Sequence, residues 1–188
     1  MFRLGTTSYI IPADILPNVE FLAPQVDDVQ LVLFETDEYG SNLPDAAARE
    51  RLLQLAAEHG LTYTVHLPLD LAFGGDAEAL HLSLVKARRV IEATQDLNPV
   101  AYTLHLDGRP LLVDGGCGPE QVAAWQANAC RALETVSGWV SDPALLCIEN
   151  LERWDPEAFT AVLARVPVSR TIDVGLSLIH ISEPTRPY

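Results

Sequence analysis

The sequence predicts an α/β fold in which most strands run parallel and each strand is followed by a helix. Short β-rich apolar runs alternate with longer segments of helical periodicity from residue 3 to residue 174. Successive strand ends fall roughly 25 to 45 residues apart, which is the length of a strand, a crossover helix and a return. This alternation indicates a mostly parallel sheet buried on both faces, within one domain of 188 residues.

The first half of the chain is expected to hold three strands and three helices. The strands are residues 3–8, 29–34 and 61–66, and the helices are residues 13–23, 44–59 and 76–94. Pro12 and Pro44 stand where a first helical turn tolerates proline. The second helix is expected to end at His59-Gly60, because glycine suits the position after a helix and a basic residue suits its negative end.

The second half continues the same alternation. Strands are expected at residues 100–105, 145–149 and 169–174, and helices at residues 119–136 and 156–164. Five complete units and a sixth strand are too few for an eight-unit barrel of about 250 residues. No G-x-G-x-x-G motif follows the first strand, and the glycine cluster at 115–118 is more typical of a flexible loop than of a phosphate-binding loop. These residues alone leave both a doubly wound open sheet and a β/α barrel possible.

The charge balance excludes several functions. Twelve Lys and Arg residues against 26 Asp and Glu residues give a formal net charge of −14 and a pI near 4.5. Binding duplex nucleic acid through its backbone, or an anionic membrane surface, requires clustered basic residues, so neither partner is expected. There is no apolar run of about 18 residues and no signal-peptide pattern at the N-terminus, and three cysteines suggest no disulfide framework. We therefore expect a cytoplasmic protein that acts on a small molecule; the oligomeric state is left open.

Reactive side chains recur where the expected strands end. In parallel α/β folds these positions meet at one edge of the sheet. The residues there are Thr6, Thr7, Glu35, His66, His105, Glu149, Asn150 and Asp173. Imidazoles and carboxylates that converge on one volume need a cation between them, and mixed nitrogen and oxygen donors suit Zn²⁺ or Mn²⁺. The set predicts a divalent metal site.

Each of these residues also has a simpler interpretation. A single histidine at a strand end is often only a satisfied polar residue, and Glu35 stands in an acidic stretch typical of a solvated loop. Asp173 could cap a following helix. Cys147 is expected to be a buried, inert thiol. The metal interpretation rests on the repetition of such groups at matching positions of successive units.

Four short segments resemble the xylose-isomerase-like TIM barrels. They are Tyr63–His66, Thr103–His105, Cys147–Asn150 and Thr171–Gly175. That superfamily includes sugar isomerases and epimerases and the endonuclease-IV-type phosphodiesterases. The resemblance implies a TIM (β/α)8 barrel, truncated here to about five and a half units. It also implies that the metal ligands are His66, His105, Glu149 and Asp173, with Glu149 and Glu35 as active-site carboxylates.

Further segments resemble the cobamide-remodelling phosphodiesterases of this superfamily. They are residues 4–14, 28–35, 71–76 and 104–108. This resemblance implies metal-dependent hydrolysis of the phosphodiester that joins the corrin side chain to the lower-ligand nucleoside. Two alternatives stay open: a metal-dependent sugar or sugar-phosphate isomerase or epimerase, and a degenerate barrel without catalysis.

The last 13 residues depart from the family pattern. The resemblance predicts Asp-x-x-His from Asp173, but the fourth position is Leu176, and Pro184 and Pro187 oppose a crossover helix. Residues 176–188 resemble translated sequencing-adapter read-through of the kind that ends metagenomic reading frames. We therefore expect residues 1–175 to be a partial barrel, residues 176–188 to be non-native, and the truncated chain to have little or no activity.

Overall fold

The computed structural model describes residues 2–36, 40–111, 117–151 and 156–175. Its strands are β1 (Gly5–Thr7), β2 (Asp28–Val32), β3 (Glu35–Thr36), β4 (Gly40–Ser41), β5 (Thr62–His66), β6 (Ala101–Leu104), β7 (Leu146–Glu149) and β8 (Ser169–Thr171). Its α-helices are α1 (Ile15–Leu22), α2 (Ala46–His59), α3 (Ala77–Thr94), α4 (Pro119–Ser137) and α5 (Pro156–Leu163). Residues 115 and 116 of the glycine cluster and the whole 176–188 segment lie outside the described residues. None of the helices described is long and apolar enough to cross a membrane.

Six strands form one sheet, in the order β1-β2-β5-β6-β7-β8, and every pair in it is parallel. All six are the strands that the sequence predicts, and each of the five helices also falls within two residues of its expected bounds. Because consecutive parallel strands are neighbours, each helix crosses over one strand spacing. The carboxyl ends of the strands therefore meet along a single edge, as the site prediction requires.

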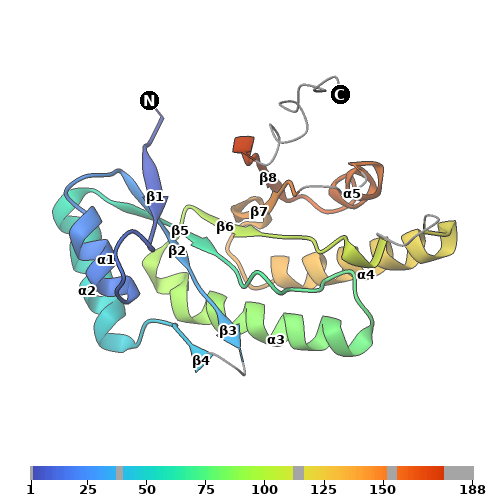
Figure 1. The fold of residues 1–188 in the computed structure, drawn as a ribbon, viewed down its shortest axis with the longest axis horizontal. Helices are drawn as coiled ribbons and strands as arrows, with labels where there is room; N and C mark the ends of the chain where they lie inside the picture. The colour runs from blue at the N-terminus through green and yellow to red at the C-terminus, as the bar shows by residue number, and fades with distance from the viewer. Residues whose placement is uncertain (1, 37–39, 112–116, 152–155, 176–188) are drawn as a thin grey trace, which may run out of the picture.

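The helices lie outside the curve of the sheet, whose inner side stays open in Figure 1. Burial follows this arrangement: Val29 and Leu31 of β2 are fully buried, whereas Asp28 and Gln30, which alternate with them, are half-buried. The expectation of a sheet buried on both faces is therefore wrong for the described residues. Helices on one side only are the arrangement of a barrel rather than of a doubly wound sheet. The barrel is partial, since neither β1 nor β8 pairs with a second strand within the described ranges.

The inner face carries polar side chains that satisfy one another. Asp28 accepts hydrogen bonds from the hydroxyls of Thr62, at 2.6 Å, and Thr64. Gln30 Nε2 lies 3.5 Å from Thr103 Oγ1 on a strand two places away. Cys147 also faces inward and is only half-buried, so the expectation of a fully buried thiol was wrong. Burial nevertheless raises the pKa of the Cys147 thiol, which is therefore protonated at neutral pH.

Local signals explain where the elements begin and end. Asp45 accepts from the backbone N–H of Ala48 at the start of α2, and Gly60 ends that helix with φ of +67°, as predicted. The β3–β4 hairpin was not predicted. Next to this hairpin, the side-chain amide of Asn42 binds the backbone that follows β2. Its Oδ1 accepts from Phe34 N at 2.8 Å, and its Nδ2 donates to Val32 O at 3.0 Å. β2 therefore ends two residues earlier than the apolar run.

Trp125 of α4 joins the loops that follow β5 and β6. Its indole N–H donates to the carbonyl of Asp107 at 2.9 Å, and only 2% of the residue is exposed. The other loop approaches at Gly74, where a Cβ atom would lie 2.0 Å from the indole nitrogen. The space around Trp125 thus requires a glycine at this position.

Replacing Gly74 by alanine is expected to lower the free energy of unfolding by about 1–3 kcal/mol, because the added methyl group must displace the indole. Urea unfolding followed by circular dichroism measures the change. Gly118→Ala is the matched control, since the nearest atom to its Cβ would be 3.6 Å away. We expect a loss of less than about 1 kcal/mol there. Equal losses in the two variants would contradict the packing argument.

Candidate metal centre

Three strand ends deliver the side chains of the candidate site. His66 is the last residue of β5, His105 directly follows β6, and Glu149 is the last residue of β7. In the sheet, Thr103 pairs with His66 on one side and with Cys147 on the other. Two residues further along the strands, His105 and Glu149 therefore stand side by side on the inner face. The register, not sequence proximity, brings the three residues together.

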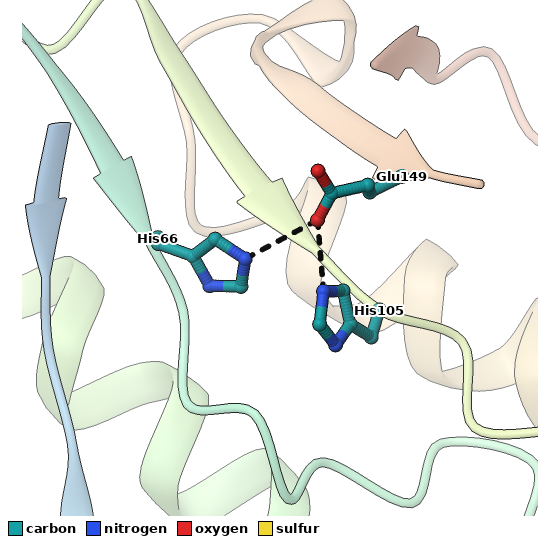
Figure 2. Close-up of side chains that lie close together, drawn as sticks. All are labelled: His66, His105 and Glu149. Atoms are coloured by element: carbon teal, nitrogen blue, oxygen red, sulfur yellow. Dashed lines mark hydrogen bonds and ion pairs between the residues drawn. The ribbon is translucent and has the colours of Figure 1, made fainter. Parts of the chain in front are cut away.

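One carboxylate oxygen lies between the two imidazoles, as Figure 2 shows. Glu149 Oε2 is 2.8 Å from His105 Nε2 and 3.4 Å from His66 Nε2. The two rings meet edge to face, with their centroids 4.9 Å apart and an interplanar angle of 86°. The three potential ligand atoms all lie within 4.8 Å of one another. They form a compact donor set of two nitrogens and one oxygen.

The protonation of His66 favours a cation in this set. Its Nδ1 lies 2.7 Å from the carbonyl oxygen of Leu67, which can only accept, so Nδ1 carries a hydrogen. In the neutral imidazole the lone pair is then on Nε2, directed at the carboxylate of Glu149. Two electron-rich atoms facing each other require either an additional proton or a metal ion between them. A backbone carbonyl that fixes the tautomer is also the usual support of a metal-binding histidine, so these residues fit a divalent ion.

Glu149 is ionised at neutral pH. In the metal-free chain, the hydrogen bond from His105 and the one that an additional proton allows from His66 lower its pKa to about 2, and they outweigh the partial burial that would raise it. A side chain only 15% exposed thus retains a full negative charge. It supplies the anionic donor that a site with two neutral imidazoles needs to attract a dication.

Asp173, the fourth predicted ligand, lies just beyond β8 and is half-buried. It does not belong to the group of ligand atoms within 4.8 Å that His66, His105 and Glu149 form. Asn150, which follows Glu149, holds the backbone of Asp173 through both ends of its side-chain amide. This contact was missed from the sequence, although an Asn directly after a strand-end Glu was its visible signal. The role of Asp173 as a ligand stays a prediction.

Glu35, the other predicted carboxylate, has a different partner. Its Oε2 lies 3.1 Å from the guanidinium of Arg89 in α3, and the residue is 8% exposed. It is not part of the three-residue cluster. Its catalytic role stays a prediction, and the ion pair with Arg89 is the contact that the structure shows.

The loop after His105 contains an internal ion pair. Arg109 donates from Nε and Nη2 to the two carboxylate oxygens of Asp107, both at 2.8 Å. Burial would raise the pKa of Asp107, but the hydrogen bonds from Arg109 outweigh it and lower the pKa. Two hydrogen-bond donors of Arg109, Nε and Nη2, are thus already used within the loop. Together with Trp125, which binds the Asp107 carbonyl, this pair fixes the backbone that follows His105.

Comparison with known proteins identifies the fold. No protein-family model matches the chain, and no curated protein matches it either. Among solved structures, a D-tagatose 3-epimerase-like protein aligns with a TM-score of 0.74 and 18% identity over 94% of this chain and 66% of its own. Endonuclease IV from Thermus thermophilus aligns with a TM-score of 0.67 and 19% identity over 94% of this chain and 64% of its own. A D-psicose 3-epimerase aligns with a TM-score of 0.68 and 17% identity over 97% and 67%.

These neighbours are xylose-isomerase-like TIM-barrel proteins. The chain has the fold of part of such a barrel. It spans about two thirds of the length of the structures that it matches. At these identities the likeness establishes the fold alone, and it confirms the expected TIM-barrel class.

Proposed function

We propose that the chain binds a divalent metal ion, Zn²⁺ or Mn²⁺, at His66, His105 and Glu149, and that it belongs to a metal-dependent sugar isomerase or epimerase. The observation that carries the metal site is the single oxygen of Glu149 placed between two imidazole nitrogens. The sugar reaction is supported by the comparisons, in which two of the three structures described are a sugar 3-epimerase and an epimerase-like protein. Among the sequence-based hypotheses, the comparisons thus favour the alternative over phosphodiester hydrolysis.

The residues have separate tasks in this proposal. Glu149 contributes the negative charge, and His66 presents the Nε2 lone pair that its Leu67 contact leaves free. When bound, the ion would polarise the carbonyl and hydroxyl oxygens of a ketose. Epimerisation also needs a carboxylate that takes up and returns a proton. Glu35 is the strand-end carboxylate outside the proposed metal ligands that we assign to this task.

Phosphodiester hydrolysis is the second candidate, and the pair of histidines favours it. Two imidazoles beside a carboxylate suit a site that activates water for attack on a phosphodiester. A net charge of −14 disfavours DNA as the substrate but leaves room for a molecule with one phosphodiester and a largely neutral body. A cobamide has that chemistry, so cobamide hydrolysis remains the specific form of this candidate.

Metal binding by this chain is tested first. Metal-free protein is titrated with Zn²⁺ and Mn²⁺, and stoichiometry and affinity are measured by calorimetry. We expect saturable binding by the wild type and a loss of affinity of at least about 10- to 100-fold in His66→Ala. His59→Ala is the matched control, because His59 is an exposed residue at the end of α2. This variant should bind the metal as tightly as the wild type does. Equal binding by wild type and His66→Ala would exclude this site.

Substrate assays then separate the reactions. The metal-loaded chain is incubated with ketohexoses such as D-fructose in D₂O, and deuterium incorporation at the epimerising carbon is followed by NMR. In parallel it is incubated with bis(p-nitrophenyl) phosphate and with a cobamide. Metal-dependent exchange supports the epimerase, and hydrolysis without exchange supports the phosphodiesterase. Robust metal-dependent turnover by this chain would contradict the expectation that it has little or no activity, and tight metal binding without either reaction would agree with it.

A further inference from the structure

The side chain of Asn150 forms a clasp between the ends of β7 and β8. Its Oδ1 accepts from the backbone N–H of Asp173 at 2.7 Å, and its Nδ2 donates to the carbonyl of Asp173 at 3.1 Å. The backbone N–H of Asn150 also donates to the carbonyl of Thr171 at 3.3 Å. A primary amide that pairs with both polar groups of one residue imitates a neighbouring strand.

The clasp extends the sheet beyond its last regular pair. Glu149 pairs with Thr171, and Asp173 follows two residues beyond this last pair. β8 has only three residues and, within the described ranges, a single neighbouring strand. The backbone after Thr171 would therefore be free to move away from the rim if nothing held it. The amide of Asn150, the residue directly after Glu149, holds this backbone in place.

A second feature makes room for the carboxylate of Asp173. A Cβ atom at Gly175 would lie 3.1 Å from Asp173 Oδ1, closer than an ordinary van der Waals contact. Gly175 thus leaves space on one side, while Asn150 fixes the backbone on the other. In the metal-free chain, the carboxylate lies outside the group of His66, His105 and Glu149. Three protein donors leave coordination positions of a divalent ion open, and a fourth donor can fill one of them.

We propose that Asn150 is a positioning residue that presents Asp173 as the fourth protein ligand of the metal. This inference rests on the proposed metal site but goes beyond it, because it assigns a function to a residue that does not contact the metal. Asn150 acts through the backbone of Asp173. Its loss therefore affects the metal as the loss of the Asp173 carboxylate does, and the two losses do not add.

Cobalt substitution tests the proposal without any assay of turnover. Co²⁺ is titrated into metal-free wild type, Asn150→Ala, Asp173→Ala and the double variant, and the visible absorption of the ion reports its affinity and coordination. We expect Asn150→Ala to bind Co²⁺ about 10- to 100-fold more weakly, as for other residues that support a ligand. Its spectrum should change in the direction seen for Asp173→Ala. The double variant should bind no more weakly than Asp173→Ala alone.

Asn42→Ala is the matched control. The side-chain amide of Asn42 also binds backbone through both its oxygen and its nitrogen, at Phe34 N and Val32 O. Asn42 follows β2 in the sequence and is not part of the group formed by His66, His105 and Glu149. We expect both asparagine variants to lower the unfolding temperature, and only Asn150→Ala to alter the Co²⁺ spectrum. A wild-type spectrum in Asn150→Ala or in Asp173→Ala would overturn the inference, as would additive losses in the double variant. Absence of Co²⁺ binding by the wild type would overturn the metal site itself, a different result.

Discussion

Replacing Glu149 by glutamine is expected to weaken metal binding by more than the roughly 10- to 100-fold loss that substitution of a supporting residue causes. Glutamine has nearly the same shape but no charge, so the site loses the anionic donor between His66 and His105. The two neutral imidazoles then hold the dication without the negative charge of the carboxylate that lies between them. Calorimetric titration of metal-free protein with Zn²⁺ measures the loss.

A control separates the loss of this donor from the loss of one negative charge in an acidic protein. Glu120→Gln removes an exposed carboxylate from the first turn of α4. We expect its Zn²⁺ affinity to equal that of the wild type, because exposed charges at a distance are screened by salt. If Glu149→Gln bound Zn²⁺ as tightly as Glu120→Gln, the cluster in Figure 2 would not be the metal site.

The second large effect concerns pH. The pKa of Glu149 in the folded, metal-free chain is about 2, below its ordinary value of 4.5, because of the hydrogen bond from His105 and the one that an additional proton allows from His66. A depressed pKa in the folded state stabilises the protein above the unfolded-state pKa, and this contribution is lost as pH falls from about 5 to about 2. The difference corresponds to about 3 kcal/mol. The metal-free wild type should therefore lose this much more unfolding free energy than Glu149→Gln over that range.

Urea unfolding of both proteins at several pH values, in the presence of a chelator, measures this effect. Other carboxylates titrate in the same range, but they are common to both proteins and cancel in the comparison. The stability gap between wild type and Glu149→Gln should shrink as pH falls. A gap independent of pH would show that the two histidines do not hold the carboxylate in its ionised form.

Much of the fold follows from local sequence signals. The apolar runs locate all six strands of the main sheet, and Gly60 marks the end of α2 because its left-handed conformation suits glycine. The β3–β4 hairpin could not be predicted in this way. It depends on the amide of Asn42 reaching back to Val32 and Phe34, a contact made only after the chain has turned.

Part of the candidate site can likewise be predicted from the sequence, and part depends on the folded chain. Parallel strands that alternate with helices end at one edge, so the sequence by itself determined that His66, His105 and Glu149 belong to one rim. Only the tertiary structure decided that one oxygen of Glu149 lies between the two imidazoles, because that depends on the register of β5, β6 and β7. It also decided that Glu35 pairs with Arg89. Residues 54 positions apart in the sequence have no local signal of their contact, since only the packing of α3 against the sheet brings them together.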